Sequence, residues 1–521
     1  MPSRIGLVNY RITLTRDPAR RQHSTISIPS RIALFKAKKQ SSRSTAMKPT
    51  VVLYPVAGMG HVVPMVELAK LFALHDFAVA VVLMHSPTKH PSFDPFVARV
   101  SASHPSISFH QLPPPAESVD DHSGKLFFDS IRENNPQFLQ FLSSYRQESD
   151  VRSVVLDFFC TDALEVTAEL RLRTHFFFSS GASDLAVFIY LPTMIAATDV
   201  SFGDLGDAPL HFPGISPIPA SHMPGHLLNR ESVMFEKIVH VCGRLPDADA
   251  ILINSFDLLE SEALETLRSG ACVPGRRMPS VYCVGPLVVD ARGDIGERKE
   301  ERPACLEWLD AQPRGSVIFL CFGSMGSFSV DQLEQIATGL ERSGQRFLWV
   351  IRAPPSGEGV NLILPPSEPD LDALLPEGFL ERTKQRGMVV KSWAPQVEVL
   401  NHAAVGGFVT HCGWNSVLEA ITAGVAMVAW PLYAEQRLNK VFLVDQMKLA
   451  VAMEGYDREM VTADEVETKL RWVIESKGGK ELRERSAAMK EKAAEARREG
   501  GLSQLAMLKV IARDLEEYKS N

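Results

Sequence analysis

The chain has 521 residues, which is too many for one ordinary domain, so its length predicts at least two. Hydrophobic residues make up 45% of it and charged residues 22%, values that exclude a disordered or fibrous protein. A net charge of −7 argues against a nucleic-acid partner, because binding to phosphates needs a basic face.

The first 46 residues differ from the rest in charge. They hold ten Lys and Arg but a single acid, Asp17, and residues 47–521 alone carry 45 basic and 61 acidic residues, a net charge of −16. A segment rich in Arg and Ser and poor in acids resembles a transit peptide. Met47, however, opens the run MKPTVVLYPVAGMGH, which looks like a native amino terminus, so we favour an extension that the functional protein lacks. In either case we predict disorder in residues 1–46.

The cysteine residues and the hydropathy of the chain indicate in which cellular compartment the protein is expected. The seven Cys residues are an odd number without a C-x-x-C pair, which predicts neither a disulfide framework nor a zinc site and suits a reducing compartment. No apolar run approaches the roughly 18 residues of a membrane-spanning helix. We therefore expect a cytoplasmic monomer without an integral membrane segment. Peripheral association with the endoplasmic reticulum and organelle targeting by residues 1–46 are the alternatives.

Strand and helix patterns alternate along the first half of the chain. The apolar run Thr50–Val56 predicts a buried parallel strand, followed by a Gly-rich turn and an amphipathic helix at Val63–Leu74. Further strands are predicted at Ala78–Met84, Ser153–Leu156, Thr174–Phe178 and Ala250–Asn254. This βαβ rhythm predicts a doubly wound, Rossmann-like parallel sheet within residues 47–288.

A charged segment without apolar periodicity, residues 289–303, predicts an exposed linker, after which the alternation restarts. Strands are predicted at Ser316–Phe322, Phe347–Arg352, Met388–Lys391, Gly407–Thr410 and Ala426–Ala429. Helices are predicted at Val330–Ser343, Pro395–Leu400, Asn415–Ala423 and Ala434–Gln446, and a Pro-, Gly- and Ser-rich surface loop at Ala353–Asp372. We expect a second Rossmann-like domain over residues 304–480, and a helical segment over residues 481–521 that packs back toward the first domain.

The stretch with the most chemical information reads WAPQVEVLNHAAVGGFVTHCGWNSVLEAITAGVAMVAWPLYAEQ, residues 393–436. Its strand GGFVTH ends at His411, and CGWNS turns directly into a helix whose first N–H groups have no helical partner. Such a helix start binds anions. Gly413 allows a close approach of the backbone, Asn415 and Ser416 add side-chain donors, and His411 can donate to a phosphate oxygen.

Other residues of this stretch suit the remaining parts of a nucleotide sugar. Glu419 lies one helical turn after Asn415 and can accept from both ribose hydroxyls. Trp393 can stack on a planar base, and Gln396 can contact the nucleoside sugar. The turn FGSMGS follows another strand, so Ser324 can reach the same pyrophosphate, and two such turns could offset its charge without a metal. Glu435 and Gln436 can read the hydroxyls of a hexose.

These 44 residues closely resemble the signature box of plant family 1 UDP-dependent glycosyltransferases. That family has the GT-B fold, two facing Rossmann-like α/β domains with the active site in the cleft between them. The resemblance extends from about Thr50 to the carboxyl terminus. The pieces PVAGMGH, VVLDFFCTDA and CLEWLDAQP look most like the subfamily that acts on flavonoids and related phenolics.

The resemblance implies a role for each matching residue. It implies that Trp393 stacks on uracil, that Glu419 holds the ribose and that Glu435 and Gln436 hold the donor sugar. His411, Asn415 and Ser416 would hold the diphosphate. The expected donor site also includes Ser324, Ala394, Gln396, Trp414 and Tyr433. A final Gln is associated with glucose in the family and a His with galactose, so we favour UDP-glucose and keep UDP-galactose as the alternative. UDP-sugar is a co-substrate, and no cofactor or metal is expected.

The acceptor chemistry calls for a base. A phenol has a pKa near 10 and must lose its proton as the new bond forms, for which histidine is the first candidate. His61 ends the Gly-rich turn after the first strand, and Asp157 ends a later strand, so both face the crevice of a Rossmann-type domain. The family resemblance points to the same two residues, with Asp162 as the competing carboxylate. Ser179 or Ser180 would line the acceptor site.

Three other functions are weighed against this one. An NAD-dependent dehydrogenase is disfavoured, because Val63 occupies the third glycine position of G-x-G-x-x-G. A glycosidase would need a placed carboxylate pair, and a silent UDP-sugar-binding protein would be expected to have lost its base. Asp370–Asp372 and Asp247–Asp249 imitate a D-x-D metal site by composition only.

The acceptor itself stays open. In this architecture acceptor pockets are built from variable loops, which we place at Pro105–Asn135 and Pro192–Leu228. Their apolar and aromatic content predicts a flat apolar ligand, such as an anthocyanidin, flavonol, chalcone or simple phenol. We therefore predict an inverting, metal-independent hexosyltransferase that forms a β-O-glycoside on such a phenol.

Overall fold

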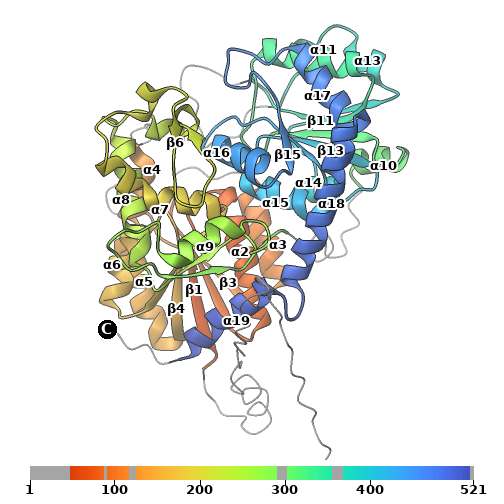
Figure 1. Cartoon of the computed structure of the whole chain (residues 1–521). Coiled ribbons are helices and arrows are strands. Elements are labelled where there is room, and N and C mark those ends of the chain that lie inside the picture. The colour runs from red at the N-terminus through yellow and green to blue at the C-terminus, as the bar shows by residue number, and fades with distance from the viewer. Residues whose placement is uncertain (1–46, 87–90, 116–124, 290–301, 355–367, 517–521) are drawn as a thin grey trace, which may run out of the picture. The chain divides into compact units, whose positions relative to one another are not determined.

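The computed structural model describes residues 47–86, 91–115, 125–289, 302–354 and 368–516. The disorder predicted for residues 1–46 and almost all of the predicted linker, residues 289–303, lie outside this part. Residues 48–521 form one compact unit, which holds two parallel sheets with helices packed on them (Figure 1). The α/β fold with two Rossmann-like sheets is therefore confirmed.

The first sheet has seven parallel strands in the order β3-β2-β1-β4-β5-β8-β9. Their bounds are β1 Pro49–Tyr54, β2 Ala78–Leu83, β3 Ile107–Gln111, β4 Asp150–Asp157, β5 Arg173–Phe178, β8 Ala250–Ile253 and β9 Ser280–Cys283. The helices between them are α2 Met59–Leu74, α3 Phe93–Ser103, α4 Lys125–Glu133, α5 Asn135–Glu148, α6 Leu164–Glu169, α7 Ala182–Ala196, α8 Val233–Arg244 and α9 Ser261–Ser269.

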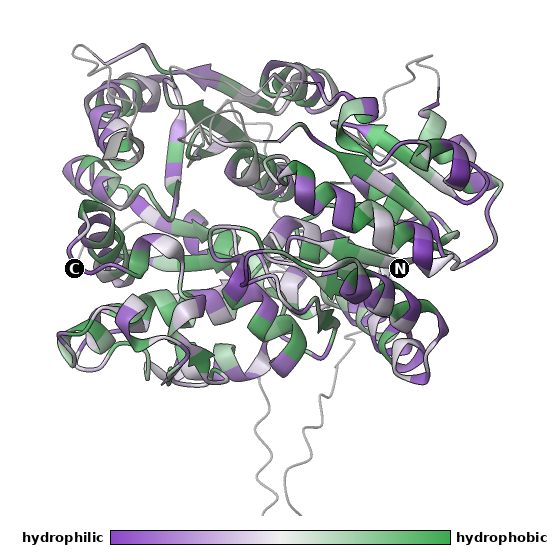
Figure 2. Ribbon diagram, turned by 90° about the horizontal axis from the view of Figure 1, so that it is seen from above, coloured by the Kyte–Doolittle hydropathy of each residue, from purple (hydrophilic) through white to green (hydrophobic). Residues whose placement is uncertain are grey.

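Alternate side chains of each strand enter two separate cores. Val51 and Leu53 of β1 pack with residues of α2 and α3, whereas Val52 and Tyr54 pack with residues of α5 and α7. Because both faces of the sheet are covered, its inner strands β1 and β2 are apolar almost throughout, as is typical of parallel sheets. Figure 2 shows this as green strands between helices that mix green with purple.

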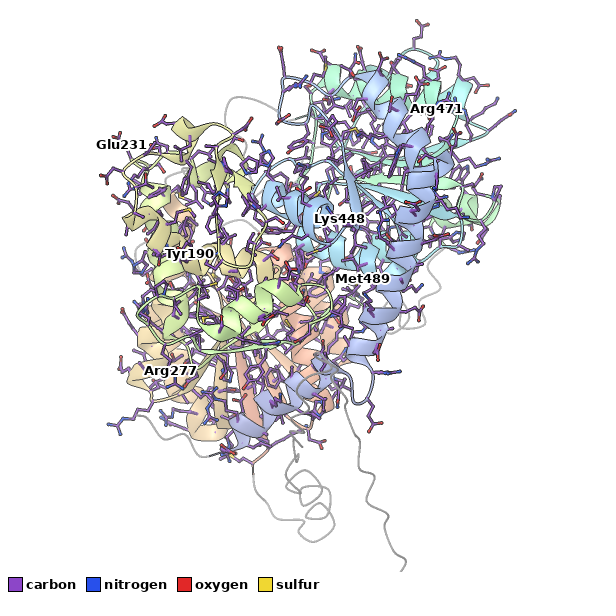
Figure 3. All side chains as sticks on the ribbon, viewed as in Figure 1. Tyr190, Glu231, Arg277, Lys448, Arg471 and Met489 are labelled. Atoms are coloured by element: carbon purple, nitrogen blue, oxygen red, sulfur yellow. The ribbon has the colours of Figure 1, made fainter. Side chains whose placement is uncertain are left out.

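The second sheet has six parallel strands in the order β12-β11-β10-β13-β14-β15. Their bounds are β10 Val317–Cys321, β11 Arg346–Ile351, β12 Gly387–Lys391, β13 Val405–Thr410, β14 Met427–Ala429 and β15 Ala450–Ala452. Its helices are α10 Ala304–Asp310, α11 Val330–Ser343, α12 Leu371–Leu374, α13 Phe379–Thr383, α14 Gln396–Leu400, α15 Trp414–Ala423, α16 Gln436–Val441 and α17 Ala463–Glu475. The exposed Arg471 of α17 points outward at the surface of this half (Figure 3).

Every predicted strand is present within three residues of its predicted ends, but several other predictions need correction. The predicted loop at residues 105–135 contains β3 and α4, and the one at 192–228 contains a short antiparallel pair, β6 Pro209–Leu210 and β7 Ile218–Pro219. Helix α2 begins at Met59, four residues before its predicted start. The predicted helix at 434–446 is α16 followed by a π-helical turn, Phe442–Gln446.

The carboxyl-terminal run forms two helices, α18 Lys477–Arg497 and α19 Leu502–Leu515, separated at Gly500 and Gly501. Gly500 has a φ of +79°, which ends α18 without strain. Residue 480, where we placed the end of the second domain, falls inside α18. Met489 of α18 packs against the core of the second sheet (Figure 3), whereas α19 packs on the first sheet.

A buried polar cluster fixes α19 to the first sheet. Asp514 is fully buried, and its two carboxylate oxygens accept from Ser153 Oγ at 2.7 Å and from His175 Nε2 at 2.8 Å. Arg173 lies 3.9 Å from the same carboxylate and donates to the carbonyl of Arg513. One carboxylate on α19 therefore satisfies donors from two neighbouring strands, β4 and β5.

We expect Asp514→Ala to lower the free energy of unfolding by about 3 kcal/mol, because removing one partner of a buried ionic cluster leaves the others unpaired. Denaturation in urea measures the change. Asp464→Ala is the matched control, since Asp464 forms an exposed ion pair with Arg342 at 2.7 Å and solvent-screened surface pairs contribute little to stability. If the two substitutions lowered the free energy of unfolding equally, the stabilising role assigned to the buried Asp514 would be wrong.

Candidate active site

The order of strands reverses once in each sheet, between β1 and β4 in the first and between β10 and β13 in the second. In open α/β sheets, ligands bind at the carboxyl ends of the strands at such a reversal. His61 follows β1 and Asp157 is the last residue of β4, while Ser324 follows β10 and His411 follows β13. These four sequence-predicted residues thus lie at the reversal points.

His61 and Asp157 are hydrogen-bonded, with 2.8 Å between Nδ1 and Oδ2. His61 lies in the first turn of α2, and the side chain of Asp157 is fully buried. The other carboxylate oxygen, Oδ1, accepts from the backbone N–H of Phe159 at 3.1 Å. Because an ionised carboxylate only accepts, the proton of a neutral His61 sits on Nδ1, and Nε2 keeps the basic lone pair.

The surroundings of His61 set its pKa. Burial lowers the pKa of His61, but the charge of Asp157 and its hydrogen bond, together with the charge of Glu435, outweigh burial, so the pKa is raised. The rings of Phe158 and Phe159 lie 5.8 Å and 5.5 Å from the imidazole. The base candidate is therefore basic and lies beside an apolar aromatic wall.

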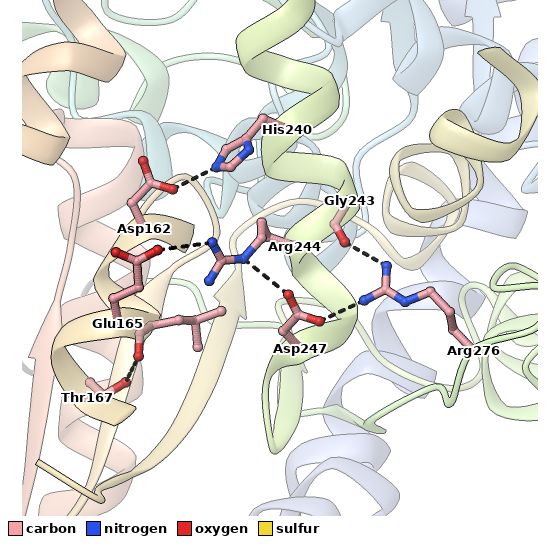
Figure 4. A network of polar contacts seen from close by, with 9 residues as sticks. Asp162, Glu165, Thr167, His240, Gly243, Arg244, Asp247 and Arg276 are labelled. Atoms are coloured by element: carbon pink, nitrogen blue, oxygen red, sulfur yellow. Dashed lines mark hydrogen bonds and ion pairs between the residues drawn. The ribbon is translucent and has the colours of Figure 1, made fainter. Parts of the chain in front are cut away.

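The competing carboxylate, Asp162, pairs elsewhere. Its Oδ1 lies 2.7 Å from Nε2 of His240, an α8 residue whose side chain is about half exposed (Figure 4). The same surface network includes Arg244, which lies 3.5 Å from Glu165. Asp162 thus takes part in a surface network and makes no hydrogen bond to His61.

The turn from β13 into α15 is built around His411. Its ring is packed between Gly323 and Gly413, where an added Cβ would lie 2.5 Å and 2.4 Å from His411 Nε2. Burial, assisted by the charge of Arg352, lowers the pKa of His411 to about 3, so the ring is neutral at pH 7. Within the described residues its Nδ1 has no hydrogen-bond partner. A neutral imidazole therefore lies at the start of a helix.

Three side chains meet beside this helix start. Gln396 donates to Ser416 Oγ at 2.8 Å and to Glu419 Oε2 at 2.6 Å. Burial raises the pKa of Glu419 to about 7. Trp393 is 67% exposed, Ala394 beside it is buried, and Ser324 is exposed. An exposed indole and a hydrogen-bonded carboxylate thus lie on the same edge of the second sheet.

The first two residues of α15 reach the other sheet. Asn415 donates from Nδ2 to the carbonyl of Gly60 at 3.1 Å. Trp414 is buried, with its indole N–H 2.7 Å from the carbonyl of Asn254. The indole of Trp414 therefore joins the two halves, so that its N–H group is not available to a ligand.

The end of the signature stretch lies within electrostatic reach of the base candidate. The amide oxygen of Gln436 accepts from the backbone N–H groups of Leu432 and Tyr433, both at 2.9 Å, which orders the turn before α16. Burial raises the pKa of Glu435, opposed by the positive charge of His61. Burial also raises the pKa of Tyr433 to about 12. Glu435 thus lies within electrostatic reach of His61.

Of the two predicted acceptor-site serines, Ser180 already has a partner. Its hydroxyl donates to Asp184 Oδ2 at 2.7 Å, and both residues are buried. Burial, together with the charge of Glu435, raises the pKa of Asp184 well above the usual carboxyl value. Ser179 is half-buried. Ser179 is therefore the more available of the two hydroxyls.

Arg352 was not selected by sequence analysis, although a charged residue directly after a buried strand is the pattern that found His61 and Asp157. Leu320 of β10 pairs with Trp349 of β11, so Arg352 and Gly323, each three residues further on, lie near one another at the carboxyl edge. Arg352 is half-buried, and within the described residues it has no hydrogen-bond or ion-pair partner.

The D-x-D pairs have structural partners. Asp370 accepts from the backbone N–H of Asp372 and caps α12, and Asp247 pairs with Arg244 and Arg276 (Figure 4). Over the described ranges no three His, Cys, Asp or Glu side chains are grouped so that they could hold a metal ion.

Comparison with known proteins places this geometry in a family. The family model "UDP-glucoronosyl and UDP-glucosyl transferase" matches residues 284–490. An anthocyanidin 5,3-O-glucosyltransferase of a Rosa hybrid cultivar is 43% identical over 475 residues, which is 88% of this chain and 98% of the relative. The chain belongs to the UDP-glycosyltransferase family.

Other relatives and solved structures support the membership of this chain in the UDP-glycosyltransferase family. A phloretin 2'-O-glucosyltransferase of Pyrus communis is 44% identical, over 88% of this chain and 98% of its own. A UDP-glucosyltransferase from Polygonum tinctorium capable of glucosylating indoxyl superposes with a TM-score of 0.80 at 33% identity, covering 91% of this chain and 100% of that one. The structure of Phytolacca americana UGT2 complexed with UDP-2fluoro-glucose and pterostilbene superposes with a TM-score of 0.78 at 31% identity. The match covers 90% of this chain and 100% of that one.

These matches confirm the GT-B fold of this UDP-glycosyltransferase. In the segments that the structure describes, no helix has the length and apolar character needed to cross a membrane.

Proposed function

We propose that this enzyme transfers glucose from UDP-glucose to a hydroxyl of a flat phenol such as a flavonoid or anthocyanidin, with inversion to a β-O-glycoside and without a metal. The observation that carries the proposal is the His61–Asp157 pair at 2.8 Å, whose imidazole lies within electrostatic reach of Glu435 at the end of the donor stretch. The relatives named for anthocyanidin and phloretin glucosylation support the acceptor class.

The donor would lie along the carboxyl edge of the second sheet. Trp393 stacks on the uracil, and Glu419, held by Gln396, accepts from the ribose hydroxyls. His411, Ser324, Ser416 and the free N–H groups at the start of α15 bind the diphosphate. Glu435 and Gln436 bind the hexose.

The transfer step is a single displacement. His61 Nε2 takes the phenolic proton as the phenolate oxygen bonds to the anomeric carbon. The bond from that carbon to the UDP oxygen breaks on the opposite face, so an α-linked donor gives a β-glycoside. The negative charge that develops on UDP is stabilised by the helix start and by Arg352. Asp157 stabilises the imidazolium that His61 becomes.

We expect Arg352→Met to weaken UDP binding by about 10- to 100-fold, because a hydrogen bond to a charged group contributes about 1.5–3 kcal/mol. Uridine binding should change little, since uridine lacks the diphosphate. Titration calorimetry with both ligands measures the difference. Arg346→Met, at the opposite end of β11, is the matched control. Equal weakening of uridine and UDP binding would mean that Arg352 contacts the uridine part of the nucleotide and not the diphosphate.

The experiment that tests the function is incubation with UDP-glucose and a panel of flavonoids, with UDP release compared to glycoside formed. Matched amounts support transfer, UDP release without glycoside indicates hydrolysis, and no turnover indicates a binding protein. A competition between UDP-glucose and UDP-galactose tests the donor. A preference for galactose would show that residues outside the signature stretch override Gln436.

A further inference from the structure

The first turn of α2 contains a carbonyl that the helix itself cannot fully satisfy. In an α-helix the N–H of residue i+4 donates to the carbonyl of residue i, and proline has no N–H. Pro64 lies inside α2, four residues after Gly60. The Gly60 carbonyl therefore lacks its regular helical donor, and Gly60 directly precedes His61.

The missing donor comes from the other sheet. Asn415, in the first turn of α15, donates from Nδ2 to the Gly60 oxygen at 3.1 Å. Its neighbour Trp414 donates to Asn254 at 2.7 Å, and a Cβ added at Gly181 would lie 2.8 Å from the Trp414 ring. The start of α15 is thus held against the first half at two adjacent residues.

The Asn415 amide has a second N–H, which points to a double role. One N–H is used on Gly60, and the amide sits where the free N–H groups of α15 form an anion site. Gly60 is the chain neighbour of His61, and Asn415 lies at the predicted diphosphate site. A single hydrogen bond therefore joins the segment that carries the base candidate to the segment that would bind the diphosphate.

We propose that Asn415 is a positioning residue that couples occupation of the donor site to the placement of His61, through the Gly60 carbonyl that Pro64 leaves without a helical donor. This inference rests on the proposed function, since it takes the diphosphate of UDP as the ligand of α15. With UDP bound, the start of α15 is ordered, the Asn415 bond is held, and the first turn of α2 is fixed. Without the bond the enzyme binds UDP but places its base less well.

Hydrogen–deuterium exchange of the full chain, with and without saturating UDP, tests the coupling. In the unsubstituted enzyme, UDP should slow exchange both in residues 412–423 and in residues 58–66. In Asn415→Ala, UDP should still slow exchange in 412–423 but no longer in 58–66, and kcat at saturating substrates should fall about tenfold. The matched control is Asn401→Ala, an exposed amide that donates to the carbonyl of Val397 within its own helix region; it should behave as the unsubstituted enzyme.

Two other results would overturn the coupling. If UDP slows exchange in 58–66 equally in Asn415→Ala, the link does not run through Asn415. If it slows exchange only in 412–423 of the unsubstituted enzyme, no coupling exists, although the donor proposal stands. Absence of protection in both segments would overturn the donor proposal and the coupling together.

Pro64→Ala tests the same link from the other side and leaves Asn415 intact. It supplies a helical N–H to Gly60, so residues 58–66 should be more protected without UDP and respond less to it. Pro192→Ala, at the proline inside α7, is the control. An unchanged UDP response in Pro64→Ala would overturn the role assigned to the Gly60 carbonyl.

Discussion

His61→Ala is expected to lower kcat toward a phenolic acceptor by about 10²- to 10⁴-fold, the usual contribution of a general base. The imidazole pairs with the buried carboxylate of Asp157 at 2.8 Å and lies within electrostatic reach of Glu435 in the donor stretch. Alanine leaves the phenol to ionise into water, which is unfavourable for a group with a pKa near 10. Initial rates of glycoside formation at saturating UDP-glucose and acceptor measure the loss.

A second His–Asp pair in the same domain provides the control. His240 lies 2.7 Å from Asp162 but is exposed on α8 (Figure 4). His240→Ala should therefore leave kcat within about twofold, as expected of a surface substitution. UDP affinity should be unaffected by His61→Ala, since His61 acts on the acceptor. If the His61→Ala enzyme kept most of its kcat, His61 would not be the general base.

The strands that could be predicted from the sequence are those buried on both faces. Continuous apolar runs such as VVLY of β1 or VIFL of β10 leave little ambiguity. The strand β3, ISFHQ, lies at the edge of its sheet with only Ile107 buried, so it lacks such a run and its sequence predicts a loop. The strands β9 and β15 span only four and three residues. Short edge strands are defined by their neighbours more than by their own residues.

The same distinction applies to the candidate site. Residues at strand ends, such as His61, Asp157 and His411, could be found because the carboxyl edge of a parallel sheet is a position that the sequence reveals. The contact between Asn415 and Gly60 could not, since it joins residues 355 positions apart. Predicting it requires the placement of one sheet on the other, which no local pattern contains.

Asp157→Asn is expected to lower kcat by about 10²- to 10⁴-fold as well, although it changes little in shape. Both oxygens of Asp157 accept, one from His61 Nδ1 and one from the N–H of Phe159. An amide has a single acceptor oxygen. If that oxygen stays with Phe159, the NH₂ group faces His61 and favours the tautomer with the proton on Nε2. The nitrogen needed to accept the phenolic proton is then occupied.

The pH dependence of Asp157→Asn separates this mechanism from a loss of folding. In the unsubstituted enzyme the raised pKa of His61 means that activity, which needs the neutral ring, is lost as pH falls through that raised value. Without the charge of Asp157, burial is the dominant remaining influence and lowers the pKa of His61, so the acid limb of the kcat profile should move to lower pH while the plateau falls.

Profiles of kcat from about pH 5 to pH 9 for Asp157→Asn and Asp162→Asn make the comparison. Asp162→Asn should keep both the plateau and the limb, because its carboxylate contacts His240 and not His61. If Asp162→Asn shifts the limb and Asp157→Asn does not, the partner of the base is Asp162, and the His61–Asp157 hydrogen bond has only a structural role.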